Sequence, residues 1–376
     1  MYVYPASDLG GIAQYILSIV RYLPRDKYDI HVAVFGNGPL CELLKHESIS
    51  VHHQKVDYSF FSFIQAIFSF RKFLKVKNFD LIHAHNAKAG FLSSIANKNF
   101  ASRIVYTGHS FRFEQKKCFI TRALFFRFER FICRSSTFIT CLSKTELDFG
   151  ISKGLLDNRK TSIVSMSIDV NRFLNVSREE AENRREKFNI PKDAFVVGMV
   201  GRISYEKSPI TFLKVASILN SQLREVHFLW VGDGDMKGKL IRTANKFGLS
   251  DKMKITGQQV PEEIPKLLSA IDVWLLTSKI EAMPIALMEA MAAKKLIVAT
   301  NVGSIHEIIK DNITGWLYNV GDYHTAALLV KKIYDDKRKS NEIGKAAHDL
   351  IVNQYSPKEK MSKDYQTIYE NILGYD

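Results

Sequence analysis

Two glutamates stand eight residues apart in an otherwise apolar stretch, SKIEAMPIALMEAMAAK (residues 278–294), at Glu281 and Glu289. The preceding IDVWLLTS is typical of a buried strand, and Pro284 suits the first turn of a helix. Glu281 then falls in the loop at the carboxyl end of the strand, near a helix N-terminus that favours an anion. Carboxylates that face a cleft there accept hydrogen bonds from sugar or ribose hydroxyls. The competing interpretation is that Glu281 caps the helix and Glu289 faces solvent.

Two cations stand five residues apart in VGRISYEKSP (residues 200–209), where Arg202 and Lys207 follow a predicted strand and precede a predicted helix. Cations at the carboxyl end of a parallel strand are placed to hold a diphosphate. A pair of solvated loop cations is the alternative. Together with the two glutamates after a neighbouring strand, the cations favour a ligand site over unrelated surface charges.

Glycines mark other turns between strands and helices. Gly10 and Gly11 open a helix, where a phosphate can approach exposed backbone N–H groups, although a plain tight turn explains them equally well. WVGDGDMKGKL is another such turn, but it lacks the spacing of the dinucleotide-binding and P-loop motifs. Gly303 and Glu307 follow the last strong strand, in TNVGSIHEII.

Histidines end two predicted strands in the first half of the chain. His109 follows the strand in VYTGHSF, and IHAHNAKAG repeats the arrangement with His83, His85 and Lys88. A lone histidine is usually structural. One at the end of a strand that faces a cleft is a better candidate for a ligand contact.

These residues need a scaffold of parallel sheets. Short apolar runs alternate with helical patterns along both halves, which predicts α/β architecture with helices on both faces of each sheet. The predicted strands are 28–35, 79–85, 103–109, 136–143, 195–201, 226–232, 253–257, 271–278 and 295–300. The predicted helices include 10–23, 87–98, 208–221, 235–247 and 284–293.

The alternation runs twice, on either side of a charged segment without strand signals, REEAENRREKFNIPKDA (residues 178–194). We therefore expect two doubly wound domains, 1–170 and 171–355, joined by a short linker and followed by a C-terminal helix in 356–376 that crosses back to the first domain. Ligands of such sheets bind at the carboxyl ends of the strands, so the expected site is the cleft between the domains.

Composition sets limits on partners. The 376 residues are 46% hydrophobic and 24% charged, as in an ordinary globular protein. Four cysteines without metal-ligand spacing are read as free thiols of a reducing cytoplasm, and neither a signal peptide nor an apolar run long enough for a membrane span is found. The net charge is +11 over residues 1–165 and +3 over residues 166–376. The basic half suggests an anionic partner.

Taken together, the motifs resemble the retaining family 4 glycosyltransferases of GT-B architecture, of the bacterial polysaccharide-assembly type. The resemblance covers nearly the whole chain. SKIEAMPIALMEAMA is similar to the family's paired-glutamate signature, SDLGGIAQYI to its glycine loop, VYTGHSF to its histidine loop and VGRISYEKSP to its diphosphate clamp. TNVGSIHEIIKDNITGWLY is similar to its closing segment.

The resemblance implies a role for each motif. Arg202 and Lys207 would neutralise the departing nucleoside diphosphate, Glu289 would hold the ribose, and Glu281 would contact the transferred sugar. His109 would touch the sugar on the acceptor side, and Gly10 and Gly11 would admit the phosphate. Backbone N–H groups of the donor loop would assist at Ala282, Met283, Pro284 and Ile285. The implied reaction is hexosyl transfer with retention, without metal or cofactor; a UDP-sugar is the favoured donor.

This sequence departs from the family pattern at several glycines. Ser208, Ala282 and Ser304 stand where the family usually has glycine, and Met166-Ser167 replaces an Asn-Gly pair at the domain junction. Each change removes backbone freedom. The cations and both glutamates are retained, so we expect activity; the departures bear on the identity of the donor.

Two segments rich in aromatic and basic residues suggest that the acceptor is bound to a membrane. In 112–134, Arg127, Arg130 and Arg134 would share a helix face next to a stripe of Ile120, Leu124, Phe128 and Phe131, and 58–75 is also rich in phenylalanine. Such surfaces dock on anionic lipid. The alternative is a pair of core helices whose cations extend to solvent. On the surface interpretation the acceptor is polyprenyl-linked, and the cytoplasmic protein lies on the inner face of the membrane.

Rival functions share parts of this pattern. A nucleotide-sugar epimerase would act on the donor alone, and a phosphorylase would need a pyridoxal phosphate lysine and a longer chain. A membrane or anionic-ligand binding module with an inactive site fits the charge. Nucleic acid is not expected as a partner because no recognised binding motif is present.

Overall fold

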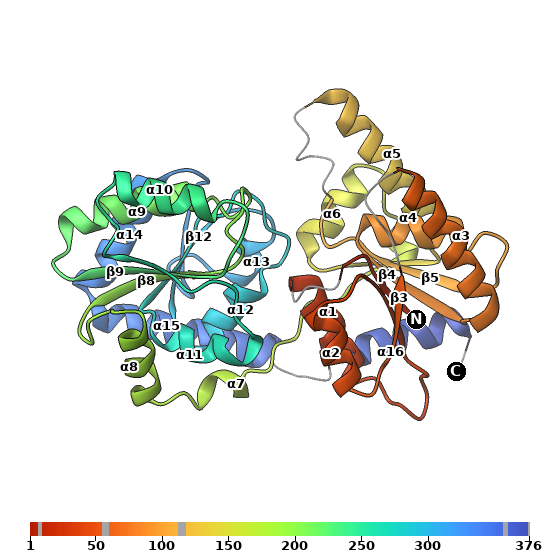
Figure 1. Ribbon diagram of the computed structural model, residues 1–376, viewed down its shortest axis with the longest axis horizontal. Coiled ribbons are helices and arrows are strands. Elements are labelled where there is room, and N and C mark those ends of the chain that lie inside the picture. The colour runs from red at the N-terminus through yellow and green to blue at the C-terminus, as the bar shows by residue number, and fades with distance from the viewer. Residues whose placement is uncertain (7–9, 55–59, 112–117, 356–359, 375–376) are drawn as a thin grey trace. The chain divides into compact units, whose positions relative to one another are not determined.

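The computed structural model describes residues 1–6, 10–54, 60–111, 118–355 and 360–374, except the side chains of 60–63 and 337–339. The chain forms two compact units (Figure 1). Unit 1 comprises Met1–Ser167 together with Lys358–Asp376, and unit 2 comprises Ile168–Pro357. Both are parallel α/β units, as the alternation of apolar strands and helices predicts.

Unit 1 is built on a seven-stranded sheet of order β3-β2-β1-β4-β5-β6-β7. The strands are β1 (Tyr2–Tyr4), β2 (His31–Phe35), β3 (Ser50–Gln54), β4 (Leu81–His85), β5 (Arg103–Thr107), β6 (Phe138–Cys141) and β7 (Thr161–Ile163). The helices are α1 (Gly11–Val20), α2 (Pro39–His46), α3 (Phe60–Lys77), α4 (Ala87–Ala96), α5 (Phe119–Ser135), α6 (Lys144–Ser152) and α16 (Lys360–Leu373). In Figure 1, α1, α2 and α16 lie on one face of the sheet, and α3, α4 and α5 lie on the other.

Unit 2 is built on a six-stranded sheet of order β10-β9-β8-β11-β12-β13. The strands are β8 (Phe195–Val200), β9 (Val226–Val231), β10 (Met253–Ile255), β11 (Val273–Leu276), β12 (Leu296–Thr300) and β13 (Trp316–Tyr318). The helices are α7 (Asn171–Leu174), α8 (Arg178–Lys187), α9 (Pro209–Gln222), α10 (Lys237–Lys246), α11 (Ile264–Ser269), α12 (Ile285–Ala292), α13 (Ile305–Ile308), α14 (Tyr323–Asp335) and α15 (Lys337–Tyr355).

The inner strands are buried on both faces. Every residue of β8, β9 and β11 is buried, and Trp230 and Trp274 are among the largest fully buried side chains. This is the reason their sequences read as continuous apolar runs rather than alternating ones. The short strands β3, β7 and β13, which are three to five residues long, were not predicted.

The charged segment after residue 177 is helical and does not link the units. Ser177 and Glu180 form a capping box at the start of α8. Arg185 then donates to Asp272 at 3.0 Å and to the Ala194 carbonyl at 2.9 Å, within unit 2. The helix is held by its cap and by Arg185, inside the second of the two expected domains.

Among the described helices, none has the length and apolar character that crossing a membrane requires.

Candidate active site

The candidate site of unit 2 lies where the order of its sheet reverses. β8 pairs with β9 on one side and with β11 on the other, so the chain leaves these neighbouring strands toward opposite sides. Ligands of parallel sheets bind at the carboxyl ends of the strands at such a switch point. The loop after β8 carries Arg202 and Lys207, and the loop after β11 carries Glu281.

Hydrogen bonds join these two loops. The Lys279 N–H donates to the Glu206 carbonyl at 2.7 Å. The Thr277 hydroxyl donates to the Lys207 carbonyl at 2.9 Å, and it is buried. These hydrogen bonds fix the loop after β8, which carries Lys207, to the loop after β11, which carries Glu281.

Lys207 and Glu281 form an ion pair across the loops. The Lys207 ammonium lies 2.5 Å from Glu281 Oε1, and the two side chains are 21% and 8% exposed. Removal from water strengthens the attraction between two charges but also makes each one costly without a partner. The structure thus brings together the predicted diphosphate ligand and the predicted sugar ligand. Arg202 lies on the same loop, and it is exposed.

The loop after β12 supports the loop that carries Glu281. Gly303 has a φ of 59°, and a Cβ added there would collide with the Glu281 carbonyl. The Ser304 hydroxyl donates to the Ala282 carbonyl. Serine at position 304 therefore replaces the family glycine with a direct hydrogen bond to the donor loop, whereas position 303 requires glycine.

Ser208 occupies another position where the family usually has glycine. Its φ is 51°, in the left-handed region, immediately before Pro209 begins α9. A side chain in this conformation costs about 1–2 kcal/mol. The Ser208 hydroxyl lies 2.9 Å from the Thr211 hydroxyl in the first turn of α9, a local contact that offsets part of the cost.

Glu289 lies on α12, half-buried. Burial raises the pKa of its carboxyl to about 7, while the Arg172 charge acts in the opposite direction. The competing interpretation, in which Glu289 faces solvent, does not fit this half-buried side chain. A half-buried carboxyl with a raised pKa is a frequent property of functional sites.

Residues 282–285 lie just before and at the start of α12. The helix begins at Ile285, so Pro284 precedes its first turn rather than forming part of it. Proline has no backbone N–H. The expected set of backbone donors is therefore corrected to Ala282, Met283 and Ile285.

In unit 1, Gly10 and Gly11 lie at the N-terminus of α1. Gly10 is the N-cap residue, with extended backbone and no side chain to satisfy the first N–H groups. An unsatisfied helix N-terminus attracts anions. The φ of Gly10, −66°, is accessible to any residue, so the backbone conformation does not require glycine here.

His109 lies beside His85 at the carboxyl ends of β5 and β4. Nδ1 of His85 and Nε2 of His109 are 3.0 Å apart, and His85 is fully buried. Burial and the neighbouring His83 hold the pKa of His85 well below its usual range. The structure thus brings together two histidines that were predicted at the ends of strands, and the buried His85 is uncharged near neutral pH.

The sequence did not indicate a network of tyrosines behind these histidines. Tyr369 of α16 lies 2.6 Å from Nδ1 of His83, and Tyr365 lies 2.8 Å from the hydroxyl of Tyr15 on α1. The same Tyr365 hydroxyl lies 3.0 Å from Thr140. Spacing by four residues on the terminal helix was the one signal available, since residues four apart share a helix face.

A second candidate surface is α5. Its inner face is anchored by Glu129, which accepts from the buried Tyr106 hydroxyl at 3.0 Å. Its outer stripe is exposed, with exposed fractions between 39% and 76% for Ile120, Leu124, Phe128 and Phe131. In Figure 1 the amino-terminal end of α5 extends beyond the sheet of unit 1.

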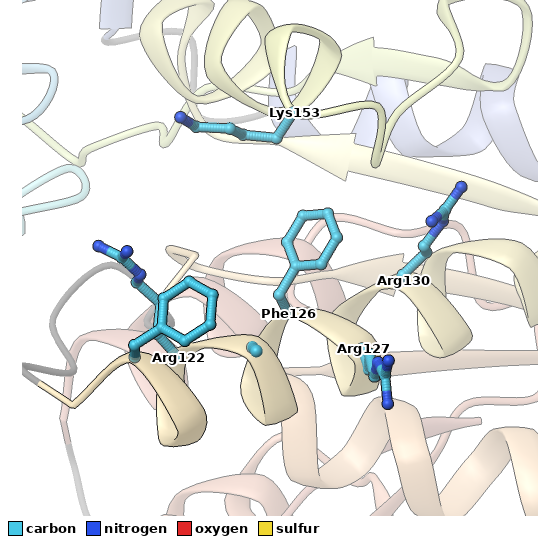
Figure 2. A pocket seen from close by; sticks show the side chains of 7 residues that line it. Arg122, Phe126, Arg127, Arg130 and Lys153 are labelled. Atoms are coloured by element: carbon cyan, nitrogen blue, oxygen red, sulfur yellow. The ribbon is translucent and has the colours of Figure 1, made fainter.

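A cavity of about 420 Å³ lies between α5 and the end of α6. Figure 2 shows Phe126 projecting from α5 into the space below Lys153. The cavity is lined by Phe119, Arg122, Ala123, Phe126, Arg127, Arg130 and Lys153. Within the described part of the chain, Arg122, Arg127 and Arg130 form no ion pair with a carboxylate, so the surface combines apolar groups with uncompensated positive charge.

The segment 58–75 behaves differently from α5. Phe70 and Leu74 are buried in the core of unit 1, whereas Phe68 is 68% exposed. For these residues the core-helix interpretation holds on one face of α3. Residues 58–59 and 112–117, which belong to the two predicted segments, lie outside the described residues.

Comparison with known proteins agrees with this geometry. The family model described as Glycosyltransferase Family 4 matches residues 9–172, and the one described as Glycosyl transferases group 1 matches residues 180–350. The chain belongs to this glycosyltransferase family. It is therefore a hexosyltransferase with the GT-B fold, and its two parallel-sheet units are those of that fold.

Individual relatives are distant but span the chain. A UDP-Gal:alpha-D-GlcNAc-diphosphoundecaprenol alpha-1,3-galactosyltransferase of Escherichia coli is 25% identical, over 94% of this chain and 92% of its own length. The putative glycosyltransferase EpsD of Bacillus subtilis is 24% identical, over 87% and 86%. The structure of Anabaena Alr3699/HepE in complex with UDP-glucose superposes with a TM-score of 0.86 at 20% identity, over 98% of both chains.

Proposed function

We propose that this glycosyltransferase moves a hexose from a UDP-sugar, with retention of configuration, to a polyprenyl-diphosphate-linked saccharide during cell-surface polysaccharide assembly. The observation that carries the donor half is the Lys207–Glu281 pair at the switch point of unit 2. A cation and a carboxylate held 2.5 Å apart match a ligand in which a diphosphate adjoins a polyhydroxylated ring.

Each residue of the donor site has a place in this proposal. Lys207 and the exposed Arg202 neutralise the diphosphate, where negative charge grows as the bond to the sugar breaks. Glu281 accepts hydrogen bonds from the sugar, and Glu289 accepts from the ribose hydroxyls. Fixed charges that act on the transition state supply much of the rate enhancement of such reactions. No metal ion or cofactor has a part in this scheme.

The acceptor half belongs to unit 1. His109 contacts the sugar, and the N-terminus of α1 at Gly10 and Gly11 admits a phosphate. The proposed polyprenyl-linked acceptor draws on the E. coli relative, whose name specifies a diphosphoundecaprenol-linked GlcNAc.

The proposed site of action is the inner face of the cell membrane, with the protein in the cytoplasm. The exposed stripe of α5 carries apolar side chains beside Arg127 and Arg130, a combination that binds anionic lipid. The net charge of +11 over residues 1–165 also favours binding to an anionic membrane surface. This arrangement delivers the protein to an acceptor that is itself anchored in the membrane.

A product assay tests the transferase proposal. The purified protein is incubated with UDP-, GDP- and ADP-sugars and a polyprenyl-diphosphate saccharide, and the anomeric configuration of the product is read by NMR. We expect an extended saccharide with retained configuration from a UDP-sugar, and loss of turnover in Lys207→Ala. Lys214→Ala, which removes the same charge from an exposed position on α9, is the matched control.

Other outcomes decide between the rivals. Conversion of the donor sugar to its epimer without acceptor supports the epimerase. Ligand binding with neither product, in folded protein, supports the binding module. A product of inverted configuration contradicts the retaining mechanism while it leaves the donor site intact.

A further inference from the structure

A cation–π contact joins the two loops of the candidate donor site, in addition to the Lys207–Glu281 ion pair. The Lys279 ammonium lies over the ring of Tyr205, 4.0 Å from the ring centroid. The Lys279 N–H also donates to the Glu206 carbonyl at 2.7 Å. The two loops thus meet in two side-chain contacts, and on each loop a single residue separates these contacts.

The contact confines the Lys279 side chain. The face of an aromatic ring attracts an ammonium that lies within about 6 Å of its centroid. Tyr205 is 53% exposed, and such contacts are weak where water reaches them, so this one contributes little to the stability of unit 2. Its effect is on position, because a lysine side chain is long and flexible and would otherwise sample many rotamers.

The charge of Lys279 is not neutralised in this arrangement. The Lys207 ammonium is paired with Glu281, whereas Lys279 forms no ion pair with a carboxylate in the part of the chain that the structure describes. A ring face attracts a cation without cancelling its charge. Lys279 therefore brings a positive charge that no carboxylate pairs with to the loop that carries Glu281.

That charge is close to the predicted ligands of the diphosphate. Consecutive Cα atoms are about 3.8 Å apart, so the Cα atoms of Lys279 and Glu281 are separated by at most about 7.6 Å, and the same limit holds between Tyr205 and Lys207. The Debye length is about 8 Å at physiological ionic strength, so charges at this separation still attract or repel each other. A diphosphate held by Lys207 is therefore within the attractive range of Lys279.

We infer that Lys279 is a further cation of the donor site and that Tyr205 is the positioning residue that holds it there. The ligand is the diphosphate of the nucleotide-sugar donor, on which negative charge grows as the bond to the sugar breaks. The inference rests on the proposed function, because it concerns the same donor. Its consequence is that the loop that carries Glu281 also takes part in stabilising the leaving group.

Comparison of UDP with uridine separates charge from loop packing. In Lys279→Gln we expect UDP binding, measured by calorimetry, to weaken about three- to ten-fold, because a charge near a diphosphate is lost. Uridine, which has no phosphate, should bind this variant as it binds the wild type in an NMR titration. The decrease of UDP affinity with added salt should also become less steep. Lys279→Arg keeps the charge and the ring contact and should keep most of the affinity.

Two variants of Tyr205 test its positioning role. Tyr205→Phe keeps the ring face and should bind UDP like the wild type. Tyr205→Leu removes the ring, and we expect it to lose part of the affinity that Lys279→Gln loses. The double variant Tyr205→Leu/Lys279→Gln should be no weaker than Lys279→Gln alone, because Tyr205 acts through Lys279. Thermal unfolding of each variant checks the fold.

Unit 2 offers a matched control of the same chemistry. The Lys214 ammonium of α9 lies 4.6 Å from the ring centroid of Tyr323, at the start of α14 and outside both donor loops. Lys214→Gln and Tyr323→Leu remove the same charge and the same kind of contact, and UDP affinity should not change in either. A loss in Lys214→Gln equal to that in Lys279→Gln would assign the effect to net charge and overturn the inference.

The remaining outcomes separate the inference from the proposed function. Unchanged UDP affinity and salt dependence in folded Lys279→Gln, in an enzyme that still transfers sugar from a UDP-sugar, would remove Lys279 from the donor site and leave the transferase. Full additivity of Tyr205→Leu and Lys279→Gln would overturn the positioning role of Tyr205. A wild type that binds no nucleoside diphosphate would overturn the proposed donor, and the inference with it.

Discussion

Lys207 and Glu281 reach each other across two loops that are 74 residues apart in sequence, with 2.5 Å between the ammonium and Oε1. Each is a predicted donor ligand, and each neutralises the other within unit 2. A diphosphate that approaches Lys207 must therefore compete with Glu281 for the same ammonium. In the proposed function the donor's sugar compensates, because its hydroxyls give Glu281 new hydrogen bonds.

This competition predicts opposite effects of two variants on UDP, which has no sugar to engage Glu281. In Glu281→Gln we expect UDP to bind more tightly, by up to about ten-fold, because Lys207 is released; a charge-assisted hydrogen bond is worth about 1.5–3 kcal/mol. In Lys207→Ala we expect UDP binding to weaken by at least about ten-fold. Transfer should fall in both variants. Calorimetry with UDP and initial rates measure the two effects, and weaker UDP binding in Glu281→Gln would contradict the competition.

Gly303 supplies a second prediction, through its approach to the Glu281 carbonyl. A Cβ at this position collides with that carbonyl, so Gly303→Ala should displace the donor loop and lower kcat/KM by roughly ten-fold or more, since small misplacements of a binding loop are costly. Gly321→Ala is the matched control. Its φ of 86° is also positive, but a Cβ there meets no atom within 4 Å.

Both variants should lose about 1 kcal/mol or more of stability from the positive φ. Only Gly303→Ala should lose activity beyond what its stability explains. Equal activities of the two variants, measured well below their unfolding temperatures, would show that the contact with Glu281 has no part in donor binding.

Glu289 predicts a pH dependence of donor binding. Burial raises its pKa to about 7, and in the proposed function a carboxylate accepts hydrogen bonds from the ribose hydroxyls better than the acid does. Affinity for a UDP-sugar should therefore rise between about pH 6 and pH 8. A UDP-sugar is used because its diphosphate does not titrate there, unlike that of UDP. In Glu289→Gln the affinity should be lower at pH 8 and independent of pH; a dependence that survives in this variant would assign it to another group.

The same shift has a consequence for stability. A carboxyl whose pKa rises from 4.5 to about 7 on folding stabilises the protein below the lower value, and this contribution is lost as the pH rises through 7. Glu289→Gln should therefore match the wild type in unfolding free energy near pH 4.5 and exceed it by about 3 kcal/mol near pH 8. Denaturant unfolding at the two pH values measures the difference. A variant less stable than the wild type at pH 8 would show that the carboxylate is satisfied within the fold.

The sequence placed the two loops of the candidate donor site beside each other, and the structure joins them by hydrogen bonds. Lys207 and Glu281 could be placed together because both follow buried strands, and the ends of parallel strands share one edge of a sheet. The ion pair itself was not predicted, since it depends on the spatial neighbourhood of β8 and β11. Contacts of α16 with the histidines were beyond reach for a similar reason: Tyr369 and His83 are 286 residues apart.

The exposure of α5 could not be decided from its sequence either. A helix with cations beside an aromatic stripe fits both a covered and an uncovered face, and the outcome depends on which neighbours pack on it. In the structure, Glu129 and Ile132 face the core and leave Ile120 and Leu124 exposed. The backbone conformation of Ser208 was not predictable from the sequence. Serine rarely adopts a positive φ, and the value of 51° occurs here at the N-cap of α9.

Membrane binding through α5 is the last prediction. Removal of three cations in Arg122→Ala/Arg127→Ala/Arg130→Ala should weaken binding to vesicles that contain an anionic phospholipid by roughly 100-fold, at about 1 kcal/mol for each charge near the surface. Replacement of Ile120 and Leu124 by serine should weaken it further, because these exposed side chains supply the apolar contact. Sedimentation with vesicles, with and without the anionic lipid, measures both.

The control for these variants removes the same charge elsewhere on unit 1. Lys27, Lys45 and Arg159 are exposed and paired with carboxylates, so their triple alanine variant changes the net charge equally without touching α5. If binding depends on α5, the control retains most of its affinity, and transfer to a soluble acceptor analogue is unchanged in every variant. Equal weakening by the two triple variants would mean that total charge, and not this helix, attracts the membrane.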